Sequence, residues 1–150
     1  FTNTDFKVRT AAIKSSTLIG DTFFTNSQWT FKYLQNVEDP SWCVRFALAH
    51  QMEDAICKTS NPSIFITTLL KLTKDSVTQV RSLSLKVLTD CSQFFTEESL
   101  SEIPQIFDQG MNSHFEEIRS ASIDLWASLL KHHKHANFDK YAKFARCSTN

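Results

Sequence analysis

The residues of this chain best suited to bind a metal ion are the histidines of the run His132-His133-x-His135. Imidazole nitrogens bind zinc, and two histidines share an ion when they lie on one face of a helix. His132 and His133 are neighbours and would point about 100° apart on a helix, whereas His132 and His135 could converge. No carboxylate or cysteine joins them at ligand spacing, so we expect no metal site.

The cysteines and the acidic pairs do not indicate catalysis. The four cysteines form no Cys-x-x-Cys pair and have no recognisable catalytic surroundings; they are Cys43, Cys57, Cys91 and Cys147. We expect reduced thiols, because the chain is long enough to build a core without disulfides. Glu97-Glu98 and Glu116-Glu117 stand near expected helix starts, where acidic side chains favour the helix dipole.

The chain has no glycine-rich phosphate loop, which two glycines could hardly form, and no Gly-x-Ser-x-Gly nucleophile elbow. We therefore expect no enzyme, no cofactor and no small-molecule substrate. The 16 basic and 16 acidic side chains cancel, which argues against a nucleic-acid partner. One basic segment, from Lys131 to Arg146, is interpreted as a solvated helix end and connector, with a phosphate-binding patch as the alternative.

No apolar run approaches the ~20 residues that a membrane-spanning helix needs, and the start of the chain has no signal-peptide pattern. We expect a protein of the cytoplasm, with the nucleus as a further location, and without a membrane partner. The chain does not begin with methionine and starts inside a repeat, so we expect a fragment of a longer protein.

A β-branched residue followed by arginine recurs along the chain at an almost constant spacing. The arginines are separated by 36, 36 and 38 residues, and the pairs are Val8-Arg9, Val44-Arg45, Val80-Arg81 and Ile118-Arg119. This period exceeds a single helix and is shorter than a domain, as in proteins that stack one supersecondary unit on copies of itself. Few glycines and prolines make a β architecture improbable.

The residues after each arginine follow a helical pattern. Four residues after it stand Ile13, Ala49, Leu85 and Ile123, and seven after it stand Ser16, Met52, Leu88 and Trp126. Such offsets mark one face of an α-helix. They predict second, or B, helices of about 6–18, 41–58, 77–94 and 115–133.

First, or A, helices are expected between these. One covers about 27–38; another starts at Asn61-Pro62, where Asn can cap free amides and Pro suits the first position. A third starts near Ser99, which has capping-box spacing to Glu102. A final apolar stripe, with Phe138 and Tyr141, indicates the A helix of a further repeat.

The turns between A and B helices also repeat. Asp39 and Asp75 each stand six residues before an arginine, whereas Asn3 and Ser113 occupy this place in the first and fourth units. An aspartate here can accept hydrogen bonds from the amides that begin the B helix. Each arginine can reach the aspartate of its own or of the neighbouring turn, so a structural ladder is expected, formed by Asp39, Arg45, Asp75, Arg81 and Arg119. Partly exposed pairs of this kind contribute at most about 1 kcal/mol each.

This pattern of helix, aspartate-bearing turn, Val-Arg and helix resembles the HEAT repeat over nearly the whole chain. The stretch from Asp39 to Phe46 further resembles the Asp-x-x-Trp-x-Val-Arg-aromatic turn of the scaffold (A) subunits of protein phosphatase 2A. The repeats here are slightly shorter than in that family, and Ser113 replaces the fourth aspartate, so the ladder is expected to break there.

The resemblance implies an all-α fold, an α-solenoid of stacked antiparallel helix pairs. It would form one array over 1–150, with units of about 1–22, 23–60, 61–96 and 97–135 and a partial unit 136–150. It also implies a non-catalytic scaffold whose turns contact protein partners, with phosphatase catalytic and regulatory subunits as the candidates. By position the contact residues would be Pro40, Ser41, Trp42, Ser76, Val77, Thr78, His114, Phe115 and Glu116.

Two interpretations of Trp42 stay open: its ring packs across the helix pair, or it lies on an exposed turn and anchors a partner, as tryptophans do at interface hot spots. Phe115 could likewise be core, because Ile118 follows closely. Two other functions also stay open. One is a tubulin-binding HEAT array of the TOG type. The turns of that class commonly carry lysine or arginine, whereas Ser76, Val77 and Thr78 are uncharged. The other is a nuclear-transport or nucleic-acid-associated solenoid that uses the basic segment.

Overall fold

A computed structural model of the protein describes residues 1–134, and this part of the chain contains helices and no strand. The prediction of an all-α chain is therefore confirmed for these residues. Four long helices follow the Val-Arg pattern: α1 (Phe6–Ser16), α4 (Trp42–Lys58), α6 (Thr78–Asp90) and α8 (Glu116–His132). Between them lie α2 (Asp21–Thr25), α3 (Ser27–Leu34), α5 (Pro62–Leu72) and α7 (Glu97–Met111), with 3-10 turns η1 (Gln35–Glu38) and η2 (Ser92–Phe94).

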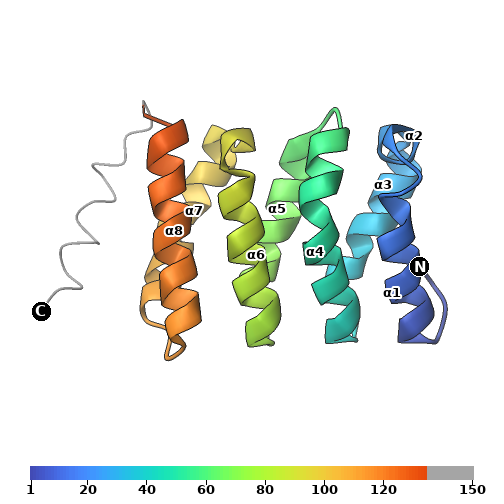
Figure 1. Cartoon of the computed structure of the whole chain (residues 1–150), viewed down its shortest axis with the longest axis horizontal. Coiled ribbons are helices and arrows are strands. Elements are labelled where there is room, and N and C mark those ends of the chain that lie inside the picture. Colours follow the sequence, from blue (N-terminus) through green and yellow to red (C-terminus); the bar gives the residue numbers. More distant parts are fainter. Residues whose placement is uncertain (135–150) are drawn as a thin grey trace, which may run out of the picture.

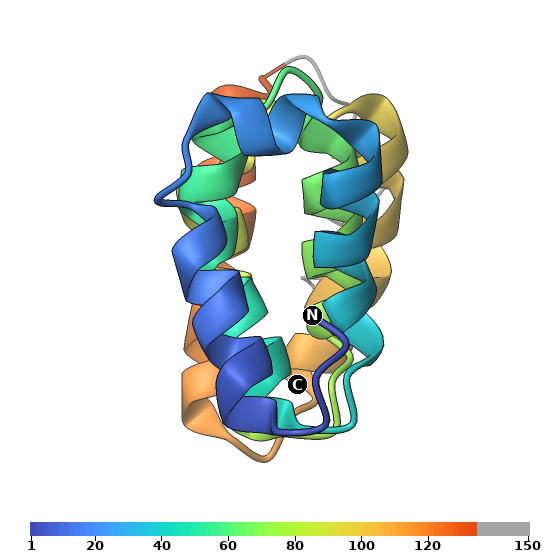
Figure 2. The same cartoon turned by 90° about the vertical axis from the view of Figure 1, so that its right-hand side faces the viewer.

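The helices form two layers. Helices α1, α4, α6 and α8 lie side by side in one layer, and α3, α5 and α7 lie behind them in the other (Figure 1). The end-on view separates the two layers and shows the short α2 at one end, near the crossing from α1 to α3 (Figure 2). Within the first layer α4 packs between α1 and α6, and α6 packs against α8. Each layer therefore places residues about one period apart next to each other.

The predicted helix starts agree with the structure except in the third A helix. This helix, α7, begins at Glu97 instead of near Ser99, because Thr96 is the N-cap. The Ser99 amide donates to Thr96 Oγ1 at 3.4 Å, and the Thr96 amide donates to Ser99 Oγ at 2.8 Å. Ser99 is thus the third helical residue of a capping box with Thr96. The predicted capping box between Ser99 and Glu102 was wrong.

The prediction that Asn61 caps the second A helix is only partly confirmed. Asn61 is the N-cap of α5, with Pro62 at the first helical position, but its side chain caps no backbone amide. Its Oδ1 instead accepts a hydrogen bond from Ser63 Oγ at 2.8 Å. The short α2 had no counterpart in the sequence analysis, since five residues are too few to show a helical period.

The helical face predicted from the arginine spacing is the buried face. Ile13, Ala49 and Leu85 are at most 2% exposed, whereas Ile123 at the same position of α8 is 50% exposed. The difference follows from packing order, because α1, α4 and α6 are each covered by the next helix of their layer. Within residues 1–134 no further helix follows α8. The segment with Phe138 and Tyr141 lies outside the described residues.

An aromatic cluster connects α2, α3 and α5. Tyr33 is fully buried, and its ring meets Phe24 edge-on at 5.4 Å between centroids; Phe24 in turn meets Phe65 at 5.6 Å. The Tyr33 hydroxyl has no hydrogen-bond partner among the described residues. Burial, with a smaller effect of Asp54, raises the pKa of this phenol far above its usual range. A buried hydroxyl without a partner is a net loss of stability.

We predict that Tyr33→Phe raises the free energy of unfolding by about 1 kcal/mol, because it removes a desolvated hydroxyl and keeps the ring in place. Urea denaturation followed by circular dichroism measures the difference. Tyr33→Leu, which also removes the hydroxyl but breaks the edge-on ring contacts, is the control and should lower stability. A loss of stability in Tyr33→Phe would show that the hydroxyl has a partner in solution.

Candidate partner-binding surface

The candidate surface is built on four turns that share one hydrogen-bond geometry. In each turn the arginine Nη1 donates to the main-chain carbonyl oxygen of the residue six positions earlier, at 2.7 Å. The pairs are Arg9 with Asn3, Arg45 with Asp39, Arg81 with Asp75 and Arg119 with Ser113. The guanidinium group therefore closes its own turn and is held in a fixed orientation.

The residue six positions before the arginine has a second shared contact. Its side-chain oxygen accepts a hydrogen bond from the amide two residues later, at 2.8 Å for Asn3, Asp39 and Asp75 and at 3.2 Å for Ser113. The donors of the last three bonds are Ser41, Val77 and Phe115, the N-cap residues of α4, α6 and α8. These side chains thus satisfy amides just before each helix, where no main-chain acceptor is available.

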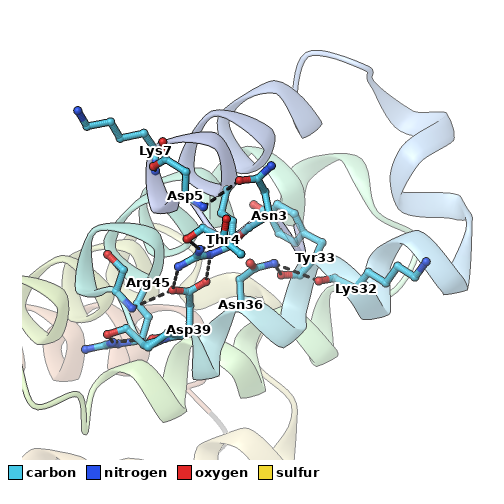
Figure 3. A network of polar contacts seen from close by, with 12 residues as sticks. Asn3, Thr4, Asp5, Lys7, Lys32, Tyr33, Asn36, Asp39 and Arg45 are labelled. Atoms are coloured by element: carbon cyan, nitrogen blue, oxygen red, sulfur yellow. Dashed lines mark hydrogen bonds and ion pairs between the residues drawn. The ribbon is translucent and has the colours of Figure 1, made fainter.

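Ion pairs connect one turn to the next. Arg9 binds both carboxylate oxygens of Asp39, with Nε at 2.7 Å and Nη2 at 2.9 Å. Arg45 binds Asp75 in the same way, at 2.6 and 3.0 Å. Figure 3 shows Asp39 of this first pair close to Asn3 and Thr4 of the preceding turn and to Arg45. Each arginine therefore uses one edge for its own turn and the other edge for the aspartate of the following turn.

These pairs are more buried than the sequence analysis assumed. The side chains are 11% and 6% exposed in the Arg9–Asp39 pair, and 13% and 4% exposed in the Arg45–Asp75 pair. Burial alone would raise the pKa of Asp75, but the hydrogen bond from Arg45, the Val77 amide and the charges of Arg45 and Arg81 outweigh it and lower the pKa. Asp39 behaves likewise, with its pKa lowered against burial by Arg9 and the Ser41 amide.

Within residues 1–134, the contact between the third and the fourth turn contains no ion pair between Arg81 and the following turn. Arg81 keeps its contacts to the carbonyls of Asp75 and Ser76, at 2.7 and 3.1 Å, but its Nη2 donates to Thr78 Oγ1 at 2.9 Å. The following turn offers Ser113, which has no carboxylate. Among the described residues the bidentate ion pairs thus connect the first turn to the second and the second to the third.

The turn residues expected to contact a partner divide into two groups. Exposed members are Pro40, Trp42, Ser76, His114, Phe115 and Glu116, whereas Ser41, Val77 and Thr78 are half-buried. Val77 packs against the core and Thr78 accepts the Arg81 hydrogen bond, so these two have structural contacts. The exposed group is the part of the turns that a partner can reach.

Trp42 is 46% exposed, and its ring meets Phe46 edge-on at 6.2 Å between centroids. The two rings line a groove of 680 Å³ that reaches from α1 across α4 to the start of α6. The other lining residues are Thr10, Lys14, Cys43, Ala47, His50, Gln51 and Gln79. The ring thus forms part of an open groove, and a volume of this order accommodates side chains of a ligand.

Most of this groove was not predicted from the sequence. Trp42, Phe46 and His50 follow one another at i, i+4 and i+8, a spacing that places them on one face of α4. Lys14 and His50 stand 36 residues apart, at the same position of successive B helices. This signal was available, but only the packing of α1 beside α4 shows that both residues line the same groove. Phe115, 52% exposed at the start of α8, is not a core residue.

The remaining candidates for chemistry are dispersed. His132 is exposed, and His133 Nε2 donates to the Ser92 carbonyl oxygen at 2.7 Å, while His135 lies outside the described residues. Residues 1–134 contain no group of three histidine, cysteine, aspartate or glutamate side chains arranged to hold a metal ion. Cys91 is buried, and burial raises the pKa of its thiol to about 12. This thiol therefore stays protonated at neutral pH.

Other sequence features lie partly outside the described residues. Cys147 and the basic segment beyond Lys134 belong to residues that the structure does not describe. Within residues 1–134, no helix has the length and hydropathy that crossing a bilayer requires.

We predict that Arg45→Gln and Asp75→Asn each lower the free energy of unfolding by about 2 kcal/mol, and that the double variant loses clearly less than the sum. Each single change leaves a desolvated charge without its partner. Urea denaturation of the four proteins gives the coupling energy. Arg81→Gln is the matched control, because Arg81 makes the same carbonyl contacts without a carboxylate, and it should lose about half as much. Additive losses would contradict a coupled pair.

The lowered pKa values of Asp39 and Asp75 predict a dependence on acid pH. Below the ordinary aspartate pKa of about 4 the unfolded chain binds protons that the folded chain excludes, so stability falls as pH decreases through the folded pKa values. The Asp39→Asn/Asp75→Asn variant keeps both turn acceptors and removes both charges. Its stability should change less between pH 6 and pH 3 than that of the unmodified protein. Parallel pH profiles would refute this assignment.

Comparisons of the chain with protein-family models, with curated proteins and with solved structures found no match.

Proposed function

We propose that this chain is part of a non-catalytic protein-interaction scaffold, an α-solenoid of HEAT-like repeats. Its units would be about 1–22, 23–60, 61–96 and 97–135, and the partial unit 136–150 lies outside the described residues. The same arginine-to-carbonyl hydrogen bond in four turns supports a repeated unit. The arrangement of the helices side by side in two layers supports stacking of such units. In a stack of this kind each unit contacts only its neighbours and the array offers extended binding faces.

The observation that carries the proposal is the groove at Trp42. A half-exposed tryptophan beside Phe46, over 680 Å³ of groove, provides a large rigid apolar surface with polar groups at its edge. Aromatic side chains of this kind dominate binding energy at protein interfaces. The exposed turn residues Pro40 and Ser76 lie two residues before the starts of α4 and α6, two of the helices that line the groove. A partner could therefore contact the turns and the groove together.

The partner class follows from the resemblance of the turn from Asp39 to Phe46. It favours the catalytic and regulatory subunits of a protein phosphatase, in a cytoplasmic or nuclear compartment. The role would be positional: the array holds two partners at a distance set by the number of units between them. The ion pairs from Arg9 to Asp39 and from Arg45 to Asp75 would hold that geometry.

We predict that Trp42→Ala weakens binding of a purified phosphatase catalytic subunit by about 30-fold, the effect of losing about 2 kcal/mol at a hot spot. Titration calorimetry measures the affinity. Helical content by circular dichroism should change little, because the ring is only partly buried.

Trp29→Ala is the matched control for this experiment. Trp29 is also about half exposed, at 52%, but it lies on α3 in the other layer and does not line the groove. Its removal should leave binding unchanged. Equal losses in both variants would indicate a general effect on folding, and intact binding by Trp42→Ala would contradict the role of the groove.

Two further measurements separate this proposal from its alternatives. Co-sedimentation with tubulin tests the TOG-type function, and nucleic-acid binding that falls steeply with added salt tests the nucleic-acid-associated function. Binding of tubulin without binding of the phosphatase subunit would replace the proposed partner class.

A further inference from the structure

In the pocket between the third and fourth turns, the fourth turn provides no carboxylate. In the second and third turns, an aspartate at the same position binds the arginine of the preceding turn. Arg9 and Arg45 each direct Nε and Nη2 at both oxygens of the next aspartate. The residue in that place for Arg81 is Ser113, whose hydroxyl accepts the Phe115 amide at 3.2 Å. Serine thus keeps the local contact of the aspartate to the amide and omits its charge.

Arg81 itself is held as its two counterparts are. Its Nη1 donates to the carbonyls of Asp75 and Ser76, at 2.7 and 3.1 Å, which fixes the plane of the guanidinium group. Its Nη2 turns to Thr78 Oγ1, and its Nε has no hydrogen-bond partner among the described residues. In Arg9 and Arg45 the edge formed by Nε and Nη2 binds a carboxylate. In Arg81 the guanidinium group is held in a fixed orientation, but Nε of this edge has no acceptor among the described residues.

A pocket of 420 Å³ lies at this edge. Its polar lining includes Arg81, Lys74, Gln109 and Ser113, and Leu85, Ile106 and Ile118 form apolar parts of the wall. The single carboxylate in the lining, Asp75, is already bound by Arg45. Glu102 lies 3.8 Å from Lys74, and both of these side chains are 42% exposed, so this pair is loose. Arg81 and Lys74 thus face the pocket, and neither forms a hydrogen bond or a close ion pair with the Asp75 carboxylate, which is bound by Arg45.

We propose that this pocket binds a carboxylate group, which takes the place of the missing aspartate between Arg81 and the fourth turn. The planar, two-oxygen fit of a carboxylate to Nε and Nη2 is the arrangement found at Asp39 and Asp75. The group would come from an acidic side chain of a bound protein or from a small free carboxylate. The site belongs to the chain alone, so its test is independent of the groove at Trp42.

The experiment follows the arginine Nε–H signals of the 150-residue chain by ¹⁵N–¹H NMR during titration with sodium acetate, against sodium chloride at equal ionic strength. The Arg81 signal, assigned by its loss in Arg81→Gln, should shift and saturate with acetate. The Arg9 and Arg45 signals are internal controls and should stay in place, because aspartates already bind them. Acetate should also raise the thermal midpoint, and Arg81→Gln should abolish this rise.

Ser113→Asp is the decisive variant, because it supplies the carboxylate from the chain itself. Without acetate its Arg81 signal should resemble that of Arg45, and its thermal midpoint should rise by about 3 °C. Its response to acetate should weaken by at least about tenfold, the effect of losing one charge-assisted hydrogen bond. Ser113→Asn, which has the shape of aspartate without its charge, should not raise the midpoint.

Two more ligands identify the source and the class. A blocked alanine–aspartate–alanine tripeptide that binds at least about tenfold more tightly than acetate would assign the site to a polypeptide partner, since extra contacts add to the same ion pair. Equal affinities would assign it to a small free carboxylate. Tighter binding of inorganic phosphate than of acetate would overturn the assignment to a carboxylate. An unchanged Arg81 signal, or an equal response in Ser113→Asp, would overturn the site.

Discussion

The two-sided use of arginine is the interaction on which this structure depends. A guanidinium group has donors along two edges, and it is rigid and always charged. Here Nη1 closes the turn that begins its own helix, while Nε and Nη2 bind the aspartate of the next turn. One side chain therefore couples the start of a helix to the position of its neighbour. Since these pairs are largely buried, the loss of either partner leaves a desolvated charge, which makes the coupling strict.

The groove at Trp42 follows from this spacing. Helices α1, α4 and α6 are held side by side with their starts aligned, so side chains one period apart lie next to each other. Lys14 and His50 become neighbours in this way, and Trp42 and Phe46 provide the apolar part of the surface between them and Gln79. The ring of Trp42 is half exposed because it stands at the first position of α4, above the layer contact that buries Ala49 and Met52.

Much of the fold was predictable because it depends on local contacts. The period of the Val-Arg pairs located four helix starts, and the residues four positions after the arginine identified the buried face of α1, α4 and α6. Prediction was wrong where two local signals competed: Thr96 and Ser99 both have capping chemistry, and only the pairing of the two shows which one begins α7. Asn61 has the right place for a cap, but its side chain binds Ser63. The short α2 contains too few residues for a pattern.

The sequence by itself determined the helical class, the repeat and the identity of the turn residues, since these follow from contacts within about seven positions along the chain. The tertiary structure alone decided which aspartate each arginine binds. That choice joins residues 30 positions apart and depends on how neighbouring helices are placed. It also decided that Trp42 and Phe115 are exposed and that Arg81 faces a serine across a pocket. Exposure and pocket shape arise from packing between helices, which no local pattern encodes.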